Sequence, residues 1–323
     1  MAKKIKEIVY KETENSSRDT NFNPHEDEYS LKFSYFEDGS VARLTKEETG
    51  YSGDKSSITY NFNYDIVGEI QVEEKESDYY ETYNYVVKLD DRGNATEVSK
   101  NGKKLASFGY TNDVRLGKVV TYKYGDEDEQ HIFSYENGLM SKYTCDDGYE
   151  DADEYTFDGS YYTNKYPNNG MIDVMAYLGD GFDFDFLFYI GRLAKTSDYC
   201  LEKTPGYAYY DKESSNVPKY TDGPNKYIRT VTGKSVEYSD EPSPVGYTFD
   251  DDKNLTEVKT SVPYKINKYS YEIWTTDDYE ERPEWDEESQ KKVMVKYYYT
   301  TTKNHKEEYV KSGEDYYTYT INY

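Results

Sequence analysis

One short phrase, an alternating aromatic pair followed by acidic, Asn or Gly residues, recurs along the chain and limits what it can fold into. A clear copy is "FSYFEDGSVARL", which begins at Phe33. The aromatic pair places two rings on one face of a strand, and the residues after it accept the positive φ of a tight turn. Further copies begin at Phe62, Val87, Phe108, Phe133, Tyr155 and Tyr247. Each copy therefore predicts one β-hairpin.

The spacing of the copies predicts how the hairpins are joined. From Phe33 to Tyr155 the phrase returns every 21 to 29 residues, enough for about two strands with their turns. The dipeptide Asn137-Gly138 is the strongest hairpin signal and predicts that Tyr135 lies across from Met140. A period that varies suits a meander better than a strict solenoid. We predict an all-β fold, a long antiparallel meander of hairpin repeats that curls into an open or closed barrel-like sheet.

The C-terminal third continues the alternation without the repeated phrase. It contains two stretches of period two, "KVMVKYYYTTT" and "EDYYTYTINY". The residues predicted to share a face are Val293, Val295, Tyr297 and Tyr299 in the first, and Tyr317, Tyr319, Ile321 and Tyr323 in the second. Both stretches therefore predict strands.

The most apolar stretch, from Met171 to Lys195, breaks the pattern. Met171, Met175 and Leu178 have helical spacing, whereas Phe182 to Phe188 alternate with Asp183 and Asp185, which favours a strand. We predict a short helix followed by a stretch of either type, which together plug one opening of the curled sheet. The whole chain, 1–323, is then one β-domain, with hairpin repeats over 1–164, the helical and aromatic plug over 165–206 and further antiparallel strands over 207–323.

The aromatic hairpins, the stretch "MIDVMAYLGDGFDFDFLFYIGRLAK" and the later "GYTFDDDKNLTEV" resemble the domain-of-unknown-function 4595 family. The resemblance implies a porin-like fold and an origin in envelope proteins of gut bacteria. Lys253 departs from it, standing where the phrase usually has Gly, and residues 196–246 show little of the pattern. The phrase also resembles the YD repeats of bacterial wrapping toxins, which need longer and more regular arrays.

The resemblance implies no catalytic residue, because the family has none assigned, but it does imply a location. Its members usually carry a lipoprotein signal. The start of this sequence, "MAKKIKEIVYKE", lacks the apolar segment of such a signal. Either the protein is cytosolic or a signal has been removed. On the resemblance, we expect a protein that is secreted, periplasmic or anchored to the outer membrane after its signal has been removed.

Charge and composition narrow the choice of partners. The chain has 42 Tyr against 12 Phe and 2 Trp, and its net charge is −25. Such an excess of acid repels phosphate, so we predict no nucleic-acid partner, and anionic lipid is disfavoured for the same reason. Strands such as "TYKYGDEDEQHIFSY" carry charge where a membrane barrel needs an apolar band, and no apolar run of 18 residues exists, so we predict a chain that does not span a membrane.

No recognised catalytic or metal-binding motif is present in the sequence. It contains no HExxH, GxSxG or GxGxxG, and its histidines, His25, His131 and His305, are scattered. Cys145 and Cys200 have no His near them in sequence, so we predict no metal, no cofactor and no nucleophile. Whether the two cysteines form a disulfide stays open.

Three weaker groupings remain. Asp183 and Asp185 could form a catalytic pair for sugar hydrolysis, but solvated acids alternating with buried Phe are the better interpretation. Asp250-Asp251-Asp252 suits a hairpin turn better than calcium. Trp274 and Trp285 flank an acidic loop, "TTDDYEERPE", and are the only candidate ligand-binding residues, although packing against the sheet is the better interpretation of both.

These observations favour a non-enzymatic envelope protein that binds a glycan or a protein through a Tyr-rich surface. The expected partner is a polysaccharide or another envelope protein. Two alternatives stay open: a glycan-acting hydrolase whose carboxylates the sequence does not identify, and a purely structural lipoprotein.

Overall fold

The computed structural model describes residues 4–15, 25–49, 55–77, 81–146, 148, 152–157, 159–167, 184–195, 197–204, 210–212, 220–221, 224–239, 241–286 and 291–323. In these parts the protein is built almost entirely of antiparallel strands, as the repeated phrase predicts.

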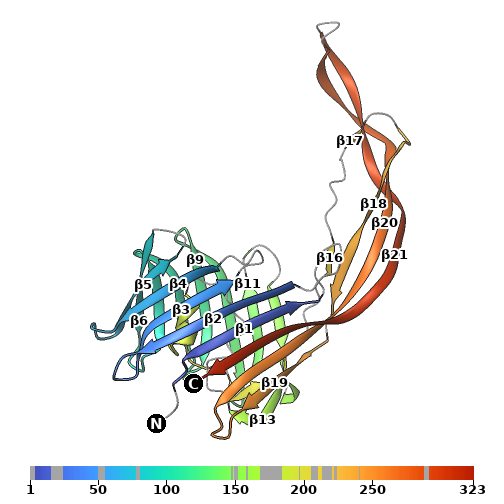
Figure 1. The fold of residues 1–323 in the computed structure, drawn as a ribbon. Coiled ribbons are helices and arrows are strands. Elements are labelled where there is room, and N and C mark those ends of the chain that lie inside the picture. Colours follow the sequence, from blue (N-terminus) through green and yellow to red (C-terminus); the bar gives the residue numbers. More distant parts are fainter. Residues whose placement is uncertain are drawn as a thin grey trace.

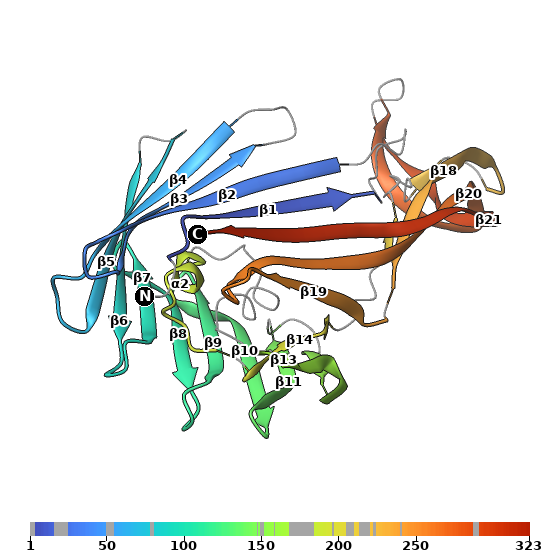
Figure 2. The ribbon, with the colours of Figure 1, turned by 60° about the horizontal axis from the view of Figure 1, so that its bottom comes forward.

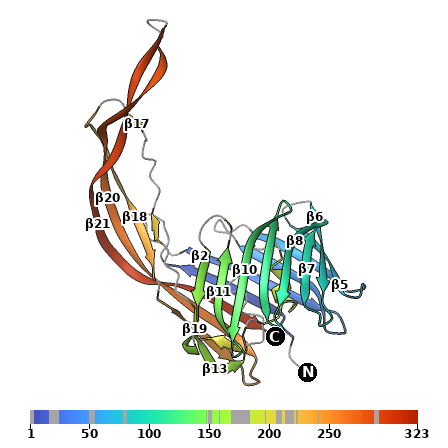
Figure 3. The ribbon, with the colours of Figure 1, turned by 180° about the vertical axis from the view of Figure 1, so that it is seen from behind.

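The N-terminal half is a meander in which each strand pairs antiparallel with the next strand along the chain. Its strands are β1 Glu7–Glu14, β2 His25–Tyr35, β3 Val41–Thr49, β4 Lys55–Asn63, β5 Glu69–Glu76, β6 Thr82–Leu89, β7 Ala95–Lys100, β8 Lys103–Tyr110, β9 Leu116–Lys123, β10 Asp126–Glu136, β11 Leu139–Asp146 and β12 Asp153–Thr156. The register places Tyr135 opposite Met140, which confirms the hairpin predicted at Asn137-Gly138. Figure 3 shows the wall that β5 to β11 form.

The C-terminal half completes the sheet. Its strands are β13 Tyr162–Pro167, β14 Tyr199–Leu201, β15 Lys203–Thr204, β16 Tyr210–Lys212, β17 Tyr220–Thr221, β18 Tyr227–Tyr238, β19 Ser243–Phe249, β20 Leu255–Asp286 and β21 Lys291–Asn322. The last strand, β21, pairs with β1 on one side and with β20 on the other, and β20 carries β19 and then β18 along its other edge. The C-terminus therefore lies beside the N-terminal strand (Figure 1).

The sheet curls but does not close into a barrel. Among the described residues, β12 pairs only with β11, and β19 pairs with the short β15 on its far side. A separate pair of strands, β13 and β14, lies between these edges (Figure 2). The Tyr162 hydroxyl donates to the Met140 carbonyl on one side of this pair, and the Val245 amide donates to the Glu202 carbonyl on the other.

A long arm projects from the curled body (Figure 1). Its frame is β20 and β21, each of 32 residues, and β18 pairs with β20 from Tyr264 to Trp274. Along the arm the apolar side chains gather in two small clusters. One contains Val236, Tyr264 and Ile266, and the other Val231, Tyr269, Tyr271 and Ile273. We refer to β18 together with β20 and β21 beyond the Tyr264–Gly313 pair as the arm.

The core of the body is the inner face of the curl, filled from the centre by the plug. The described part of the plug contains the helical turn α2, Phe186–Tyr189, which lies inside the curl (Figure 2). Phe186 is fully buried, and its ring centroid lies 5.0 Å from that of Tyr60 and 5.3 Å from that of Tyr85. The predicted aromatic plug is thus confirmed for residues 184–195.

The plug differs from the sequence prediction at Phe186–Tyr189 and at Asp185. The alternation of Phe with Asp favoured a strand through Phe188, but residues 186–189 form a helical turn, because side chains buried on every side need no two-faced pattern. Asp185 is buried at the start of that turn rather than solvated, as the sequence had suggested. Asp183 and the helix expected over Met171 to Leu178 lie outside the described residues.

The repeated phrase builds a ring of tyrosine hydrogen bonds at the turn end of the sheet. In each bond a Tyr hydroxyl near a turn donates to a backbone carbonyl of another strand or of the segment that leads into one. The bonds run from Tyr35 to Ile5, from Tyr64 to Val41, from Tyr110 to Ala95, from Tyr135 to Leu116 and from Tyr323 to Leu255. We call these five residues the tyrosine rim. Four of the five stand at the second position of the aromatic pair, where a Phe ring would fill the same space without a donor, and Tyr323 is the last residue of the chain.

We expect Tyr110→Phe to lower the free energy of unfolding by about 1–2 kcal/mol, because it leaves the carbonyl of the fully buried Ala95 without its hydroxyl donor. Urea denaturation followed by circular dichroism measures the change. The matched control is Tyr124→Phe, whose ring is 97% exposed, and it should change stability by less than about 0.5 kcal/mol. Equal losses for the two variants would contradict a stabilising role for the rim.

Candidate functional site

Trp274, one of the two tryptophans predicted to bind a ligand, lies on β20 in the arm and is partly buried. Its indole nitrogen donates to Glu272 at 2.7 Å, and the same carboxylate oxygen accepts a bond from the Asn304 side chain at 2.8 Å. Lys303 lies over the indole ring at 5.2 Å, and the Tyr227 ring packs edge-on at 5.6 Å. The indole ring is therefore packed against its neighbours on the surface of the arm.

Trp285, the other candidate, is near the far end of the same strand, where it pairs with Lys292. Eleven residues separate the two tryptophans, which corresponds to about 35 Å along a strand. The segment between them, expected to be an acidic loop, is part of β20. The structure therefore does not bring Trp274 and Trp285 together into one site.

The distal part of the arm is a two-stranded ribbon, in which Tyr279–Asp286 pairs with Lys291–Tyr298. The register places Tyr279 and Met294 on one face, and Val293 and Val295 on the other. Val293 is 37% exposed, Tyr279 43% and Met294 59%. We call this segment the distal ribbon. Its apolar side chains meet water on both faces of the two strands.

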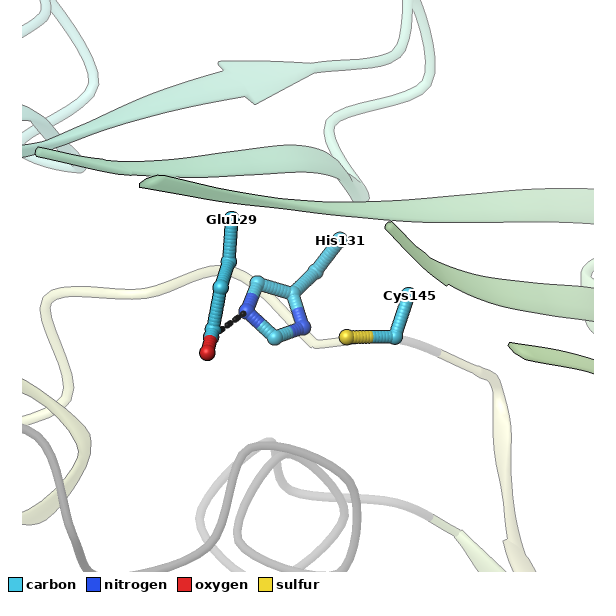
Figure 4. A group of neighbouring side chains, drawn as sticks. All are labelled: Glu129, His131 and Cys145. Atoms are coloured by element: carbon cyan, nitrogen blue, oxygen red, sulfur yellow. Dashed lines mark ion pairs between the residues drawn. The ribbon is translucent and has the colours of Figure 1, made fainter. Parts of the chain in front are cut away.

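A second group of side chains, able to bind a metal ion, lies on the inner face of β10 and β11 (Figure 4). Glu129 and His131 come from β10, and Cys145 comes from β11, where it is the register partner of His131. One ligand atom from each of the three residues lies within 4.8 Å of the others. This is the set of oxygen, nitrogen and sulfur donors from which proteins build zinc sites.

His131 is the centre of this group. Its Nε2 lies 3.3 Å from Glu129 Oε2, and its Nδ1 lies 2.9 Å from the Tyr143 hydroxyl. The ring is 3% exposed, and this burial lowers the pKa of His131 although the carboxylate of Glu129 opposes the shift. The imidazole is therefore neutral at neutral pH, which is the form that binds metals.

The sequence argument against a metal or nucleophile role rested on the absence of a His near either Cys along the chain. In the structure the pairing of β10 with β11 places Cys145 directly across from His131, so a His does lie beside this Cys in space. Cys145 and Cys200 are not joined by a disulfide, which answers the question that the sequence left open. The signal that could have found the group is the register of the Asn137-Gly138 hairpin.

The carboxylates considered for catalysis or calcium binding have local structural roles where they are described. Asp250 accepts hydrogen bonds from the Asn254 backbone and side chain, and Asp251 and Asp252 form the turn between β19 and β20, as predicted. Lys253 completes this turn with φ of +67°, the conformation that Gly has elsewhere in the repeat. This turn therefore supplies no candidate catalytic carboxylate for the hydrolase hypothesis.

The chain was compared with family models, curated proteins and solved structures. No family model matches the chain, and no curated protein matches it. One solved structure that aligns with it is the crystal structure of a porin-like protein from Bacteroides uniformis ATCC 8492. The two are 13% identical, with a TM-score of 0.49, over 93% of this chain and 96% of that one. The resemblance to the 4595 family stays a prediction.

Across the described ranges, no helix combines the length and apolar character needed to cross a bilayer.

Proposed function

We propose that the protein is a non-enzymatic binding protein of the bacterial cell envelope, and that the distal ribbon of the arm docks onto a partner protein. The envelope location rests on the resemblance noted above. The binding role rests on one observation, which is that the distal ribbon carries exposed apolar side chains on both faces of only two strands.

The energetics of such a ribbon favour a role in docking. An isolated two-stranded ribbon is at best marginally stable in water, because neither face is covered by a second layer. The Tyr279 and Tyr298 rings pack against each other on one face with a tilted geometry and centroids 5.4 Å apart, and Lys296 lies 4.1 Å over the Tyr279 ring. These contacts organise the ribbon but leave Met294 and Val293 in water. A partner that covers them gains the free energy of apolar burial.

The charge of the same segment indicates which partner fits. Between Asp277 and Lys296 the sequence has eight acidic and four basic side chains. A second copy of this chain, with its net charge of −25, would be repelled. We therefore propose a partner protein with a basic surface that contains apolar pockets. Stacking on a glycan is less well supported, because the two tryptophans lie far apart and the Trp274 ring already has Lys303 and Tyr227 against it.

The body is proposed to face water. On the outer side of the sheet, charged pairs join neighbouring strands, among them Lys32 with Glu47 and Lys88 with Glu97. Such pairs suit a sheet in water rather than in lipid. Purification in good yield without detergent is expected, and a protein that stays soluble only in micelles would overturn this part of the proposal.

Crosslinking followed by titration tests the docking role. A photoreactive amino acid at position 294 in the native host should give a protein adduct, and the partner identified in it is then purified. We expect the partner to bind the intact chain, with an affinity that falls as salt increases. A variant in which Asn-Gly replaces residues 276–299, joining the paired Thr275 and Thr300, should bind at least about tenfold more weakly.

A second variant protects this test against misfolding. The surface substitutions Tyr279→Ser, Val293→Ser and Met294→Ser leave the body intact and should weaken binding as the deletion does. The matched control carries Ser at Tyr309, which is exposed but lies outside the distal ribbon. Unchanged affinity in both ribbon variants would overturn the proposal. A melting temperature that rises when polysaccharides are added, but not when the partner protein is added, would also overturn it.

A further inference from the structure

The inner face of β10 and β11 carries a group of side chains that neither the fold nor the binding proposal uses. We propose that Glu129, His131 and Cys145 bind a divalent transition metal ion with affinity for sulfur, with Zn²⁺ as the best match. The group lies in the body, on strands outside the arm, so this site is independent of the distal ribbon.

The donor set points to the metal. A thiolate and an imidazole favour Zn²⁺ over Mg²⁺ or Ca²⁺, which prefer oxygen ligands. In a tetrahedral zinc site, bond lengths of about 2.0–2.3 Å place neighbouring N and O ligand atoms about 3.3 Å apart and N and S atoms about 3.6 Å apart. The observed separation of His131 Nε2 from Glu129 Oε2 is 3.3 Å. One ligand atom from each residue lies within 4.8 Å of the other two, and Cys145 lies on the far side of the imidazole from Glu129 (Figure 4), so the Cys145 side chain must move toward the Glu129 side to complete the site.

The surroundings of His131 are those of a metal ligand. The Tyr143 hydroxyl lies 2.9 Å from Nδ1, and its ring stacks on the imidazole with an interplanar angle of 12°. When Nδ1–H donates to this hydroxyl, the lone pair of Nε2 points toward Glu129. Metal-bound histidines are commonly held this way by a hydrogen bond from the second ring nitrogen. Tyr143 is thus a positioning residue for the proposed site.

The strands also fix the other two ligands. The Glu129 backbone amide donates to the Thr121 hydroxyl at 3.0 Å, where the pairing of β9 with β10 shifts register. The Glu129 side chain is 38% exposed, which gives an ion and a water ligand a route to the site. Cys145 is held by pairing with His131 on one side and with Asp153 on the other.

Binding would be a simple exchange of a proton for a metal. The Cys145 thiol releases its proton to solvent and forms a metal–sulfur bond, while a ring nitrogen of His131 and a carboxylate oxygen of Glu129 donate lone pairs to the metal. No electron is transferred. The affinity should therefore fall as the pH is lowered, because protons compete for the same three ligands.

Cobalt and zinc added to the full-length chain test the site. Co²⁺ should bind at one equivalent and give the charge-transfer absorption of a cobalt–thiolate bond, and Zn²⁺ should displace it. Zn²⁺ should also protect Cys145 from alkylation by iodoacetamide, as peptide mass spectrometry would show. Both measurements use the unmodified protein, so neither depends on the folding of a variant.

Substitutions then assign the ligands. Cys145→Ser should abolish the cobalt–thiolate band, whereas the matched Cys200→Ser should leave it unchanged. Glu129→Gln should weaken Zn²⁺ binding, and Tyr143→Phe should weaken it by about tenfold, as removal of a supporting hydrogen bond does elsewhere. Circular dichroism of each variant checks that the fold is retained.

Three results would overturn the proposal. One is a band that survives in Cys145→Ser, and another is an affinity for Zn²⁺ no higher than that of the Glu129→Gln/Cys145→Ser variant. The third is a Cys145 that reacts with iodoacetamide much faster than Cys200 and is not protected by Zn²⁺. This last result would assign the group to nucleophilic chemistry instead. None of these outcomes bears on docking by the distal ribbon.

Discussion

Replacing Phe186 by Ala is expected to lower the free energy of unfolding by about 3–5 kcal/mol. Phe186 is fully buried at the centre of the plug, where its ring meets Tyr60, Tyr85 and Phe62 at centroid distances of 5.0, 5.3 and 5.9 Å. Removing the ring opens a cavity between the plug and strands β4 and β6. Urea denaturation of both proteins measures the loss.

The matched control is Phe36→Ala. The Phe36 ring is 45% exposed and makes one edge-on contact with Tyr64 at 6.3 Å, so its loss should cost less than about 1 kcal/mol. A loss at Phe186 no larger than the loss at Phe36 would show that the plug is not docked in the core in solution. The curl would then need another explanation for how its inner face is covered.

The hairpins of the body could be predicted from sequence because their determinants are local. The turn after Phe33 and Tyr35 is set by Asp38, whose carboxylate accepts hydrogen bonds from the Ser40 backbone and hydroxyl, and by Gly39 at φ of +97°. The same chemistry recurs at Asp90 and at Asp250. A few neighbouring residues therefore carry enough information to position each turn.

The arm could not be predicted, because its length depends on pairing between distant segments. Val293, Val295 and Tyr297 stand at every second position, which correctly predicts a strand with these three side chains on one face. It does not show that this face lies outside a core. The acidic stretch after Trp274 has the composition of a loop, yet it continues β20 because β21 supplies its hydrogen-bond partners. Tertiary context decides such segments.

The sequence argument compared only neighbours along the chain, and even the predicted hairpin register, taken as regular, would not have paired His131 with Cys145. With Tyr135 opposite Met140, regular pairing would place His131 across from Thr144. A bulge between Ser134 and Tyr135 shifts the register, so that His131 faces Cys145 instead. Bulges recur at this end of the hairpins, before Tyr35 and Tyr110 as well as before Tyr135. An alignment of the repeated phrase that allowed for the bulge would have brought His131 and Cys145 together.

Replacing Lys100 by Met should destabilise the protein by about 3 kcal/mol at pH 8 and by much less at pH 5. Lys100 Nζ lies 3.7 Å from Glu74 Oε1, and the Glu74 carboxylate is buried, with the Tyr85 hydroxyl donating to it at 2.8 Å. Without Lys100 the carboxylate is left as a buried charge with no opposite charge beside it. The exposed Lys88→Met, which breaks the surface pair with Glu97, is the matched control and should cost less than about 1 kcal/mol.

The pH dependence follows from the direction of the Glu74 pKa. Burial raises that pKa above the ordinary value of 4.5, and Lys100 partly opposes the rise, so removing Lys100 raises it further. A carboxyl whose pKa is raised on folding contributes stability below its unfolded pKa and loses it as the pH rises through the folded pKa. The penalty of Lys100→Met should therefore grow with pH between 5 and 8. In Glu74→Gln/Lys100→Met both charges are gone, and the amide oxygen can still accept the Tyr85 hydroxyl. This double variant should recover most of the stability at pH 8, whereas additive losses at both pH values would show that the two charges are not coupled.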